Sequence, residues 1–401
     1  MSMKKKLIIV NPHINNGFFC KSLYNTITNR KDYKKYQYLF DGIKNEKFVE
    51  LSFYFDGRDS SMPFRFSLYV EVALWYLINL LNPFKNKPIF NIRKKSADTV
   101  FLFAHRNLDK ESGAELVNEI KEISDSCIVH MTHFHADIKN TSANIKLLEP
   151  KILCAESNLA SCSGLFRKHF FFYNSSFLVL PFCPQDRFKN IKINFNKRIK
   201  KAMATGTLHK YGDSSRTEEF CSFYNTNTLH PIRKEIFDNK ENFTDQIDSY
   251  IYEWLDVAKI DTTKKSINLL QRIYGKYSNH FLSKANNYFK FDMVQTFNSY
   301  QMFIAPSEKT GLPSVGMTEG MMCGAAYIGT NDISNAELGL IDKHNFISYD
   351  GSKEDLIEKI KYYQDNPNHL ETIAKNGHEY AKKEFDRKIV SKKFIDAILN
   401  L

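Results

Sequence analysis

The sequence lacks the features that mark several common classes of protein. Its 401 residues contain no C-x-x-C pair, no zinc-finger spacing and no RNA-binding signature. No dense basic run resembles a nucleic-acid-binding arm, and there is no internal repeat or low-complexity tract. These absences argue against structural zinc domains, nucleic-acid-binding proteins and repeat architectures. We therefore expect no nucleic acid among the partners.

Long apolar runs are also missing. The apolar run Leu7–Val10 near the amino terminus is too short for a secretory signal peptide. The strongly apolar stretch Phe66–Leu81 contains Glu71 and is shorter than the ~20 residues of a spanning helix. It fits a buried domain helix, or a helix on an anionic membrane surface flanked by Arg65 and Lys85. We expect a cytoplasmic protein, with a peripheral position on the inner face of the membrane as the alternative.

The seven cysteines are odd in number, widely spaced and mostly set in apolar runs. This pattern predicts buried thiols in a reducing compartment, with neither disulfides nor metal ligation. The formal net charge of +11 favours anionic partners such as nucleotide phosphates or an acidic membrane. Because the basic residues are scattered, a solvated basic surface explains the charge equally well.

Short apolar strands alternate with helical stretches along much of the chain. Continuous apolar strands in this order are typical of parallel sheets covered on both faces, which predicts the α/β class. Residues 187–200, rich in Lys and Asn, interrupt the pattern as an interdomain linker, and residues 247–257 carry helical spacing. The expected strands are 5–10, 99–104, 127–130, 151–155, 177–180, 201–205, 301–305 and 325–328. The expected helices are 113–124, 291–300, 317–323, 352–364, 367–384 and 387–399.

Residues 304–331 form the most informative segment. A strand ends in Pro-Ser-Glu308, a loop containing Gly311 follows, and Thr318 and Glu319 are expected to open a helix that ends at Gly324. Ligands of open α/β sheets bind at the carboxyl ends of strands, and helix N-termini bind phosphate. The segment therefore predicts a phosphate-bearing ligand. Glycines would permit close approach to a diphosphate, and the carboxylates would accept hydrogen bonds from sugar or ribose hydroxyls.

This segment resembles the carboxyl-terminal signature of the GT-B retaining glycosyltransferases of family 4, within the glycogen-synthase-like group. The resemblance implies two Rossmann-like domains facing each other across a cleft, a nucleoside diphosphate sugar as donor, retention of configuration and no obligatory metal or other cofactor. It also implies that Glu308 contacts the donor sugar and Glu319 the ribose, with Gly311, Leu312 and Thr318 in the same site. The matching positions are Pro306, Ser307, Glu308, Gly311, Leu312, Pro313, Glu319, Met321, Cys323 and Gly324.

The spacing of the two glutamates departs from the family pattern, because Glu308 and Glu319 stand farther apart here. Either the loop contains a three-residue insertion, Ser314–Gly316, or loop backbone near Gly311 contacts the sugar. The role of Glu319 does not depend on this choice.

Two further segments carry the resemblance. Residues 178–188 are similar to the interdomain segment of the family, and residues 202–207 to the first strand of its nucleotide domain, with Thr207 in place of an expected Arg. The resemblance implies an acceptor-side domain over 1–186, a nucleotide-sugar domain over 187–385, and a last helix, 386–401, that returns to the first domain. A later basic residue could supply the missing cation: Lys210, Arg216 or Arg233.

In the first domain, the candidate residues follow strands. Gly17 lies where GT-B enzymes have a glycine-rich acceptor loop, although an Asn-Gly pair is also an ordinary turn. The segment 129–137 resembles a family element whose His aligns the donor sugar, which makes His133 and His135 candidates; at least one of them is expected to be structural. His105 is an acceptor-side candidate or a packed histidine. A metal site is a further possibility, because His130, His133 and His135 lie within six residues. However, no complementary carboxylate–histidine motif supports one.

We therefore expect a glycosyltransferase that moves a sugar to a hydroxyl of a glycan or lipid-linked acceptor. Two alternatives stay open at this point. One is a sugar-nucleotide epimerase on the same fold. The other is a non-catalytic GT-B module that binds a glycan or a partner protein, which the missing Arg at Thr207 and the altered glutamate spacing leave open.

Overall fold

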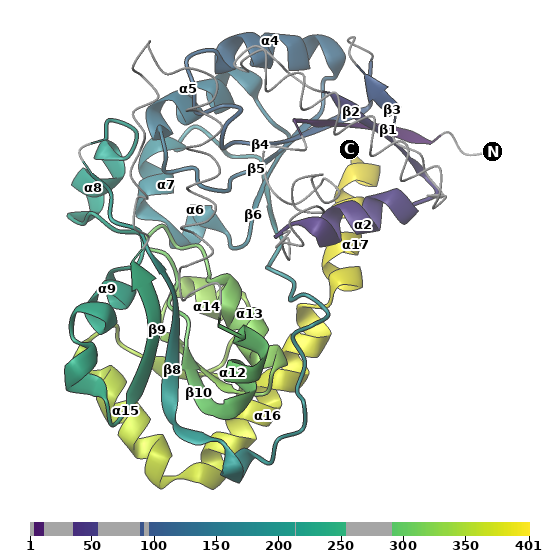
Figure 1. Ribbon diagram of the computed structural model, residues 1–401. Helices are drawn as coiled ribbons and strands as arrows, with labels where there is room; N and C mark the ends of the chain where they lie inside the picture. Colours follow the sequence, from purple (N-terminus) through teal and green to yellow (C-terminus); the bar gives the residue numbers. More distant parts are fainter. Residues whose placement is uncertain (1–3, 12–34, 55–88, 92–95, 213, 254–290) are drawn as a thin grey trace, which may run out of the picture.

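The computed structural model describes residues 4–11, 35–54, 89–91, 96–212, 214–253 and 291–401. These residues form two α/β domains, each built on a parallel sheet (Figure 1). The expected fold class is therefore confirmed.

The first domain contains a seven-stranded sheet in the order β3-β2-β1-β4-β5-β6-β7, and all its pairings are parallel. The central strand β4 is buried along its whole length, as expected for a strand covered by helices on both faces. The strands are β1 Lys5–Val10, β2 Val49–Tyr54, β3 Ile89–Asn91, β4 Thr99–Phe103, β5 Cys127–His130, β6 Ile152–Ala155 and β7 Ser176–Val179. The helices are α2 Gln37–Asn45, α4 Gly113–Ile123, α5 Ile138–Leu148, α6 Leu159–Cys162 and α7 Gly164–His169.

The second domain contains a five-stranded parallel sheet in the order β12-β11-β10-β8-β9. The chain passes from β8 to β9 on one side and then crosses to β10 on the other, so the strand order reverses between β8 and β10. In open sheets such a reversal marks the ligand-binding crevice. The strands are β8 Ile199–Leu208, β9 Ile247–Glu253, β10 Tyr300–Ile304, β11 Ala326–Thr330 and β12 Ile347–Tyr349. The helices are α8 Glu218–Tyr224, α9 Pro231–Asp238, α12 Met293–Ser299, α13 Val315–Met322, α14 Ile333–Glu337, α15 Lys353–Asp365 and α16 Pro367–Glu384, with 3-10 turns η1 Phe195–Lys197 and η2 Lys240–Phe243.

The expected strands from 5–10 to 325–328 and the expected helices from 113–124 to 387–399 are confirmed to within a few residues. The helix predicted over 247–257 is wrong in its described part, because Ile247–Glu253 form β9, which pairs with β8. The linker predicted at 187–200 is shorter than expected, since β8 already begins at Ile199.

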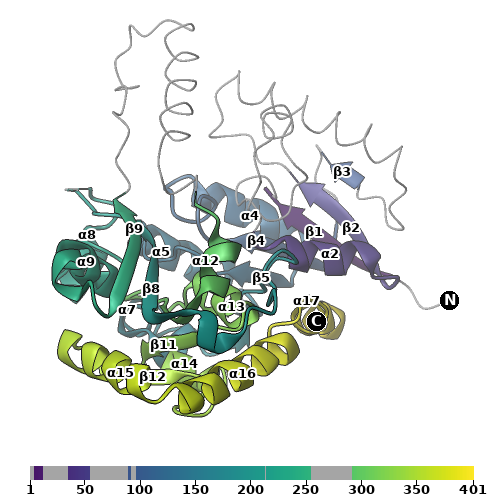
Figure 2. The ribbon, with the colours of Figure 1, turned by 60° about the horizontal axis from the view of Figure 1, so that its bottom comes forward.

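The last helix, α17 (Arg387–Asn400), leaves the second domain and packs against α2 and β1 of the first. Val390 and Phe394 are fully buried in the hydrophobic cluster that includes Leu7 and Phe101. Figure 2 shows α15, α16 and α17 following one another along one side of the molecule. Helix α17 thus forms part of the hydrophobic core of the first domain.

Candidate functional site

The loops at the carboxyl ends of the two sheets contact each other. Ser157, which follows β6, donates a hydrogen bond from Oγ to the carbonyl of Gly311, which follows β10, at 2.8 Å. Tyr211, which follows β8, lies 2.8 Å from Nε2 of His135, which follows β5. The strand ends that the sequence singled out in both domains are therefore brought together.

Helix α13 begins in this region, close to the reversal between β8 and β10. It starts at Val315, with Ser314 as N-cap, and not at Thr318 as the sequence suggested. The three residues Ser314–Gly316, considered as a loop insertion, instead form the N-cap and first helical residues. The helix N-terminus thus lies nearer to Gly311 than expected. Its unpaired N–H groups and dipole favour an anion there.

Arg233 supplies a cation at this helix N-terminus. Its Nη2 donates to Oγ of Ser314 at 3.0 Å, and its Nη1 to the carbonyl of Thr207 at 3.4 Å. The guanidinium packs on Gly206, where a Cβ would approach Arg233 Cζ to 2.8 Å and where φ is +141°. Only glycine fits both demands, so the end of β8 is shaped around this arginine.

The other two candidate cations of the second domain are engaged elsewhere. Lys210 is exposed and pairs with Glu253 at 2.6 Å, at the end of β9. Arg216 pairs with two carboxylates of the first domain, Asp109 and Asp137. Of the three cations considered from the sequence, Arg233 is the one that lies at the α13 N-terminus.

Glu308 is half-buried in a turn that precedes α13. Its Oε2 accepts a hydrogen bond from Oγ1 of Thr310 at 3.0 Å, and its main-chain N–H and C=O bond to Leu312 and Gly311. Burial raises the pKa of Glu308, while Lys35, Thr310 and Arg233 act in the opposite direction. Charged residues of both domains therefore act on the Glu308 carboxylate.

Gly311, Leu312 and Thr318 have structural partners. A Cβ at Gly311, where φ is +87°, would lie 2.8 Å from Cys162 Sγ, so close packing against the first domain requires glycine here. Leu312 is buried in the hydrophobic cluster of the first domain. The Thr318 hydroxyl donates to the carbonyl of Val315 inside α13. The signature that suggested diphosphate contacts thus also serves the interdomain contact.

Glu319 lies inside α13 and is 4% exposed. Its carboxylate has no hydrogen-bonding partner within the described part of the chain. Burial raises its pKa to about 8, with Arg187 acting in the opposite direction. A buried carboxylate of this kind suits a ligand that donates hydroxyl hydrogen bonds.

The two strand-end histidines have different surroundings. His135 is 3% exposed and is held by the Tyr211 hydroxyl and the Phe220 ring. His133 is half-buried and has a left-handed backbone conformation, with φ of +50°. Desolvation, together with Lys35 and the neighbouring histidines, lowers the pKa of His133 well below 6.5, so the imidazole is neutral near pH 7. His135 has the structural contacts, which leaves His133 as the candidate for ligand contact.

The carboxyl-terminal part of the sequence matches a known family. Residues 254–395 match the family model described as "Glycosyl transferase-like". None of the curated proteins searched matches the sequence.

Several solved structures are similar to this chain over almost its whole length. HepE of Anabaena in complex with UDP-glucose has a TM-score of 0.53 at 10% identity, covering 99% of this chain and 100% of that one. The same protein with UDP and glucose gives 0.51 at 11% identity, with the same coverage. Sucrose-phosphate synthase from Thermosynechococcus elongatus gives 0.48 at 8% identity, covering 99% of each chain. The likeness to HepE establishes the fold.

The chain has the GT-B fold, and its carboxyl-terminal part resembles glycosyltransferases. The expected fold and the resemblance to glycosyltransferases are thus confirmed, and membership of family 4 stays a prediction.

Polar groups near the carboxyl ends of the strands of the first sheet were not predicted from the sequence. The Tyr36 hydroxyl donates to Oε1 of Glu156 at 2.5 Å and lies 3.0 Å from Oγ1 of Thr132. Glu156 is 1% exposed and follows β6 directly. The rule that ligands bind at strand ends could have pointed to Glu156, whereas nothing in the sequence pairs it with Tyr36.

Some predictions concern residues that the structure does not describe. Gly17 and the apolar stretch Phe66–Leu81 lie outside the described residues. Within the described part, no three His, Cys, Asp or Glu side chains are grouped so that they could hold a metal ion. None of the helices in the described ranges is long and apolar enough to cross a membrane.

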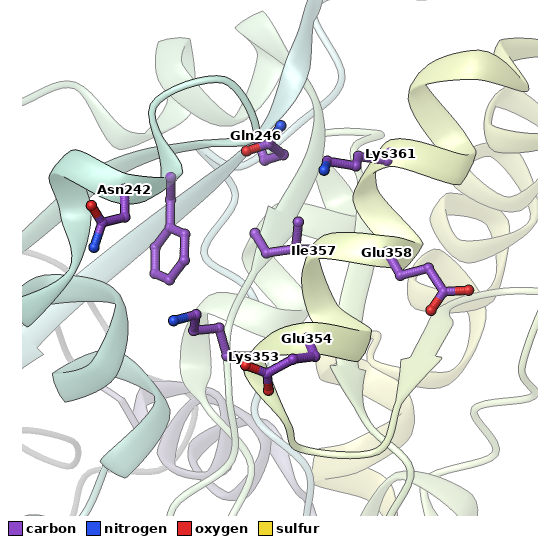
Figure 3. A pocket seen from close by; sticks show the side chains of 8 residues that line it. Asn242, Gln246, Lys353, Glu354, Ile357, Glu358 and Lys361 are labelled. Atoms are coloured by element: carbon purple, nitrogen blue, oxygen red, sulfur yellow. The ribbon is translucent and has the colours of Figure 1, made fainter.

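A separate hollow of about 600 Å³ lies on the second domain between η2 and α15 (Figure 3). None of the predicted site residues contributes to it. Its lining combines Phe243 and Ile357 with charged side chains of both signs. This hollow is therefore distinct from the candidate site.

From the raised pKa of Glu319 we predict that the free energy of unfolding depends on pH. Because its pKa is about 8 in the folded chain and about 4.3 in an unfolded one, the folded state binds the proton more tightly. The wild type should therefore lose stability as the pH rises from about 4 to 8, and Glu319→Gln should remove that loss. Urea unfolding measures the free energy of unfolding at pH 5 and at pH 9. Between these values it should fall by ~1–4 kcal/mol more in the wild type than in Glu319→Gln.

The exposed Glu358→Gln on α15 is the matched control and should leave the pH dependence unchanged. An identical pH dependence in Glu319→Gln and the wild type would show that Glu319 is not a neutral buried acid.

Proposed function

We propose that the chain transfers a sugar from a nucleoside diphosphate sugar to a hydroxyl of a glycan or lipid-linked acceptor. The observation that carries this proposal is Arg233 at the Ser314 N-cap of α13. A guanidinium and a helix N-terminus together favour the charge that develops on a departing diphosphate. They lie where the strand order of the second sheet reverses, the position at which open α/β sheets bind ligands.

The nucleotide would extend from this point along the second domain. Glu319 has a buried carboxylate suited to the two ribose hydroxyls, and Glu308 would accept a hydrogen bond from the sugar. The HepE structures contain UDP, UDP with glucose, and UDP-glucose, so uridine nucleotides are the first donors to test.

In the proposed reaction the bond between the anomeric carbon and the diphosphate oxygen breaks, and the diphosphate leaves with the electron pair. The acceptor oxygen bonds to the same carbon on the same face, and its proton passes to the departing oxygen. Configuration is then retained. No metal or other cofactor is needed, because Arg233 and the α13 N-terminus supply the electrostatic stabilisation. Contact between the domains would exclude water, which otherwise hydrolyses the donor.

The acceptor side belongs to the first domain. The net charge of +11 is compatible with a cytoplasmic enzyme that has weak, salt-sensitive contact with anionic lipid and no nucleic-acid partner. A lipid-linked acceptor would then be reached at the membrane surface.

The deciding experiment is a donor panel of UDP-, GDP- and CMP-sugars, each incubated with the purified chain. Release of nucleoside diphosphate from one donor, with transfer to an added glycan or lipid-linked acceptor, is the expected result. Conversion of the donor to its epimer would identify an epimerase. Nucleotide or glycan binding without turnover would identify a non-catalytic module.

The same assay tests the finer parts of the proposal. A chelator such as EDTA removes a catalytic metal from carboxylate and histidine ligands. Since the proposed reaction needs no metal, activity should be unchanged in excess EDTA. Nuclear magnetic resonance of the first product should show the anomeric configuration of the donor. Loss of activity with EDTA, or an inverted product, would contradict those parts and leave the sugar transfer standing.

A further inference from the structure

A segment of the second domain packs on the first. Residues 209–229, here called the clasp segment, connect β8 to α9; only residue 213 within it lies outside the described ranges. Phe220 of α8 is fully buried in the hydrophobic cluster of the first domain that also contains Phe134 and Phe166. Figure 1 shows α8 next to α7 of the first domain. The clasp segment therefore belongs to the second domain in chain order, but it packs against the first.

Arg216 is the polar centre of the clasp segment. Its Nη2 lies 2.8 Å from Oδ2 of Asp109, whose side chain is 1% exposed. Its Nε donates to Asp137, and its own carbonyl accepts the Asp137 N–H at 2.7 Å. One residue of the second domain thus holds two segments of the first, by side chain and by main chain.

Both segments support the strand-end histidines. Asp109 also lies 3.1 Å from Nδ1 of His105, and the His105 ring centroid is 5.3 Å from that of His133. Burial alone would raise the pKa of Asp109, but the His105 hydrogen bond and Arg216 lower it below its usual value, so the carboxylate is ionised. The Asp109 carboxylate therefore connects the Arg216 guanidinium to the His105 ring.

The loop between β5 and α5, residues 131–137, is strained at two positions. His133 and Asp137 both have φ of +50°, which a side chain with a Cβ rarely adopts. Such a conformation persists only where its surroundings over-determine it. Arg216 holds Asp137 at one end of the loop, and Tyr211, also of the clasp segment, holds His135. The geometry of His133 thus depends on contacts from the other domain.

We propose that Arg216 is a positioning residue that sets His133 for sugar transfer, so that the histidine site is complete only while the clasp segment is docked on the first domain. This inference rests on the proposed function. Arg216 acts through Asp109 and Asp137 and does not itself contact the donor.

Arg216→Ala should lower kcat by about tenfold to a hundredfold, the effect of a small misplacement of an aligning group. The KM for the donor and the affinity for free nucleoside diphosphate should stay within about twofold, because the nucleotide site belongs to the second domain. Arg216→Lys should restore part of kcat, since an ammonium can pair with one carboxylate but cannot bridge both. Lys234→Ala, which breaks an exposed pair with Asp238 on α9, is the matched control and should resemble the wild type.

A double-mutant cycle with His133→Ala separates positioning from general weakening. If Arg216 acts through His133, the double variant should be no slower than His133→Ala alone. Independent, additive losses would overturn the proposal, as would a loss in Arg216→Ala that appears in the donor KM instead of kcat.

Amide hydrogen exchange tests the same inference without turnover. Exchange in residues 131–137 should accelerate at least tenfold in Arg216→Ala and not in Lys234→Ala. Unchanged exchange would overturn the proposal even if no donor is found. If exchange is faster in Arg216→Ala but the wild type transfers no sugar from any donor, the role of Arg216 in holding the loop is supported and the proposed function is contradicted. Asp137→Asn repeats the measurement if Arg216→Ala does not fold.

Discussion

Arg233→Ala is expected to lower kcat/KM for sugar transfer by about 100- to 1000-fold, which corresponds to ~2.7–4 kcal/mol of transition-state stabilisation. The guanidinium lies at the Ser314 N-cap of α13 and against Gly206 at the end of β8. Negative charge on the diphosphate increases as its bond to the sugar breaks. Removal of the cation should therefore affect the transition state more than the bound donor.

The measurement is steady-state kinetics with the donor identified from the panel, together with calorimetry for the free nucleoside diphosphate. Arg233→Lys should recover only part of the activity, because an ammonium cannot reach the Thr207 carbonyl and the Ser314 hydroxyl together. Arg387→Ala, which removes a hydrogen bond to the Pro184 carbonyl and an ion pair with Asp186, serves as an arginine control. Wild-type kinetics in a folded Arg233→Ala protein would remove Arg233 from the site.

His133→Ala is expected to lower kcat by about 100-fold while nucleoside diphosphate affinity stays near that of the wild type. His133 is neutral near pH 7 because burial and nearby cations lower its pKa, so it can both donate and accept a hydrogen bond to a sugar hydroxyl. The nucleotide itself would be held by the other domain. A loss confined to kcat therefore distinguishes alignment of the sugar from binding of the base and phosphates.

Two histidine variants complete this test. His344→Ala, at an exposed position of the second domain, should behave as the wild type. His135→Ala should mainly lower thermal stability, since it removes a buried ring held by Tyr211 and Phe220. Full activity in both His133→Ala and His135→Ala would leave the histidines with a packing role only.

Most of the two sheets could be predicted because their strands are buried on both faces and read as continuous apolar runs. The failure at β9 has a clear cause. Ile247 and Ile251 are the two buried positions of β9, and their separation of four residues is also the spacing of a helix face. As an edge strand, β9 is covered less completely than the central strands, so its sequence does not alternate clearly.

The site was predictable where its residues are close in sequence. The order of strand, Gly311 loop, helix and Gly324 located the α13 region, but the helix starts earlier than the charged residues suggested. The use of Gly311 and Leu312 in the interdomain contact could not be foreseen. Gly311 contacts Ser157, which is 154 positions away in the chain, and Leu312 is buried in a cluster formed mainly by the first domain. The same holds for the Arg216 contacts with Asp109 and Asp137, which chain spacing does not encode.

The return of α17 has a consequence for synthesis. A ribosome releases the chain from its amino terminus, and domains usually fold in that order. Here Val390 and Phe394 complete the hydrophobic cluster that also contains Leu7 and Phe101. The first domain therefore emerges before the second, yet its core stays unfinished until α17 has been translated. During that interval the apolar surface that α17 will cover is open to chaperones and to other nascent chains, so this domain reaches its final packing only after the second domain has been translated.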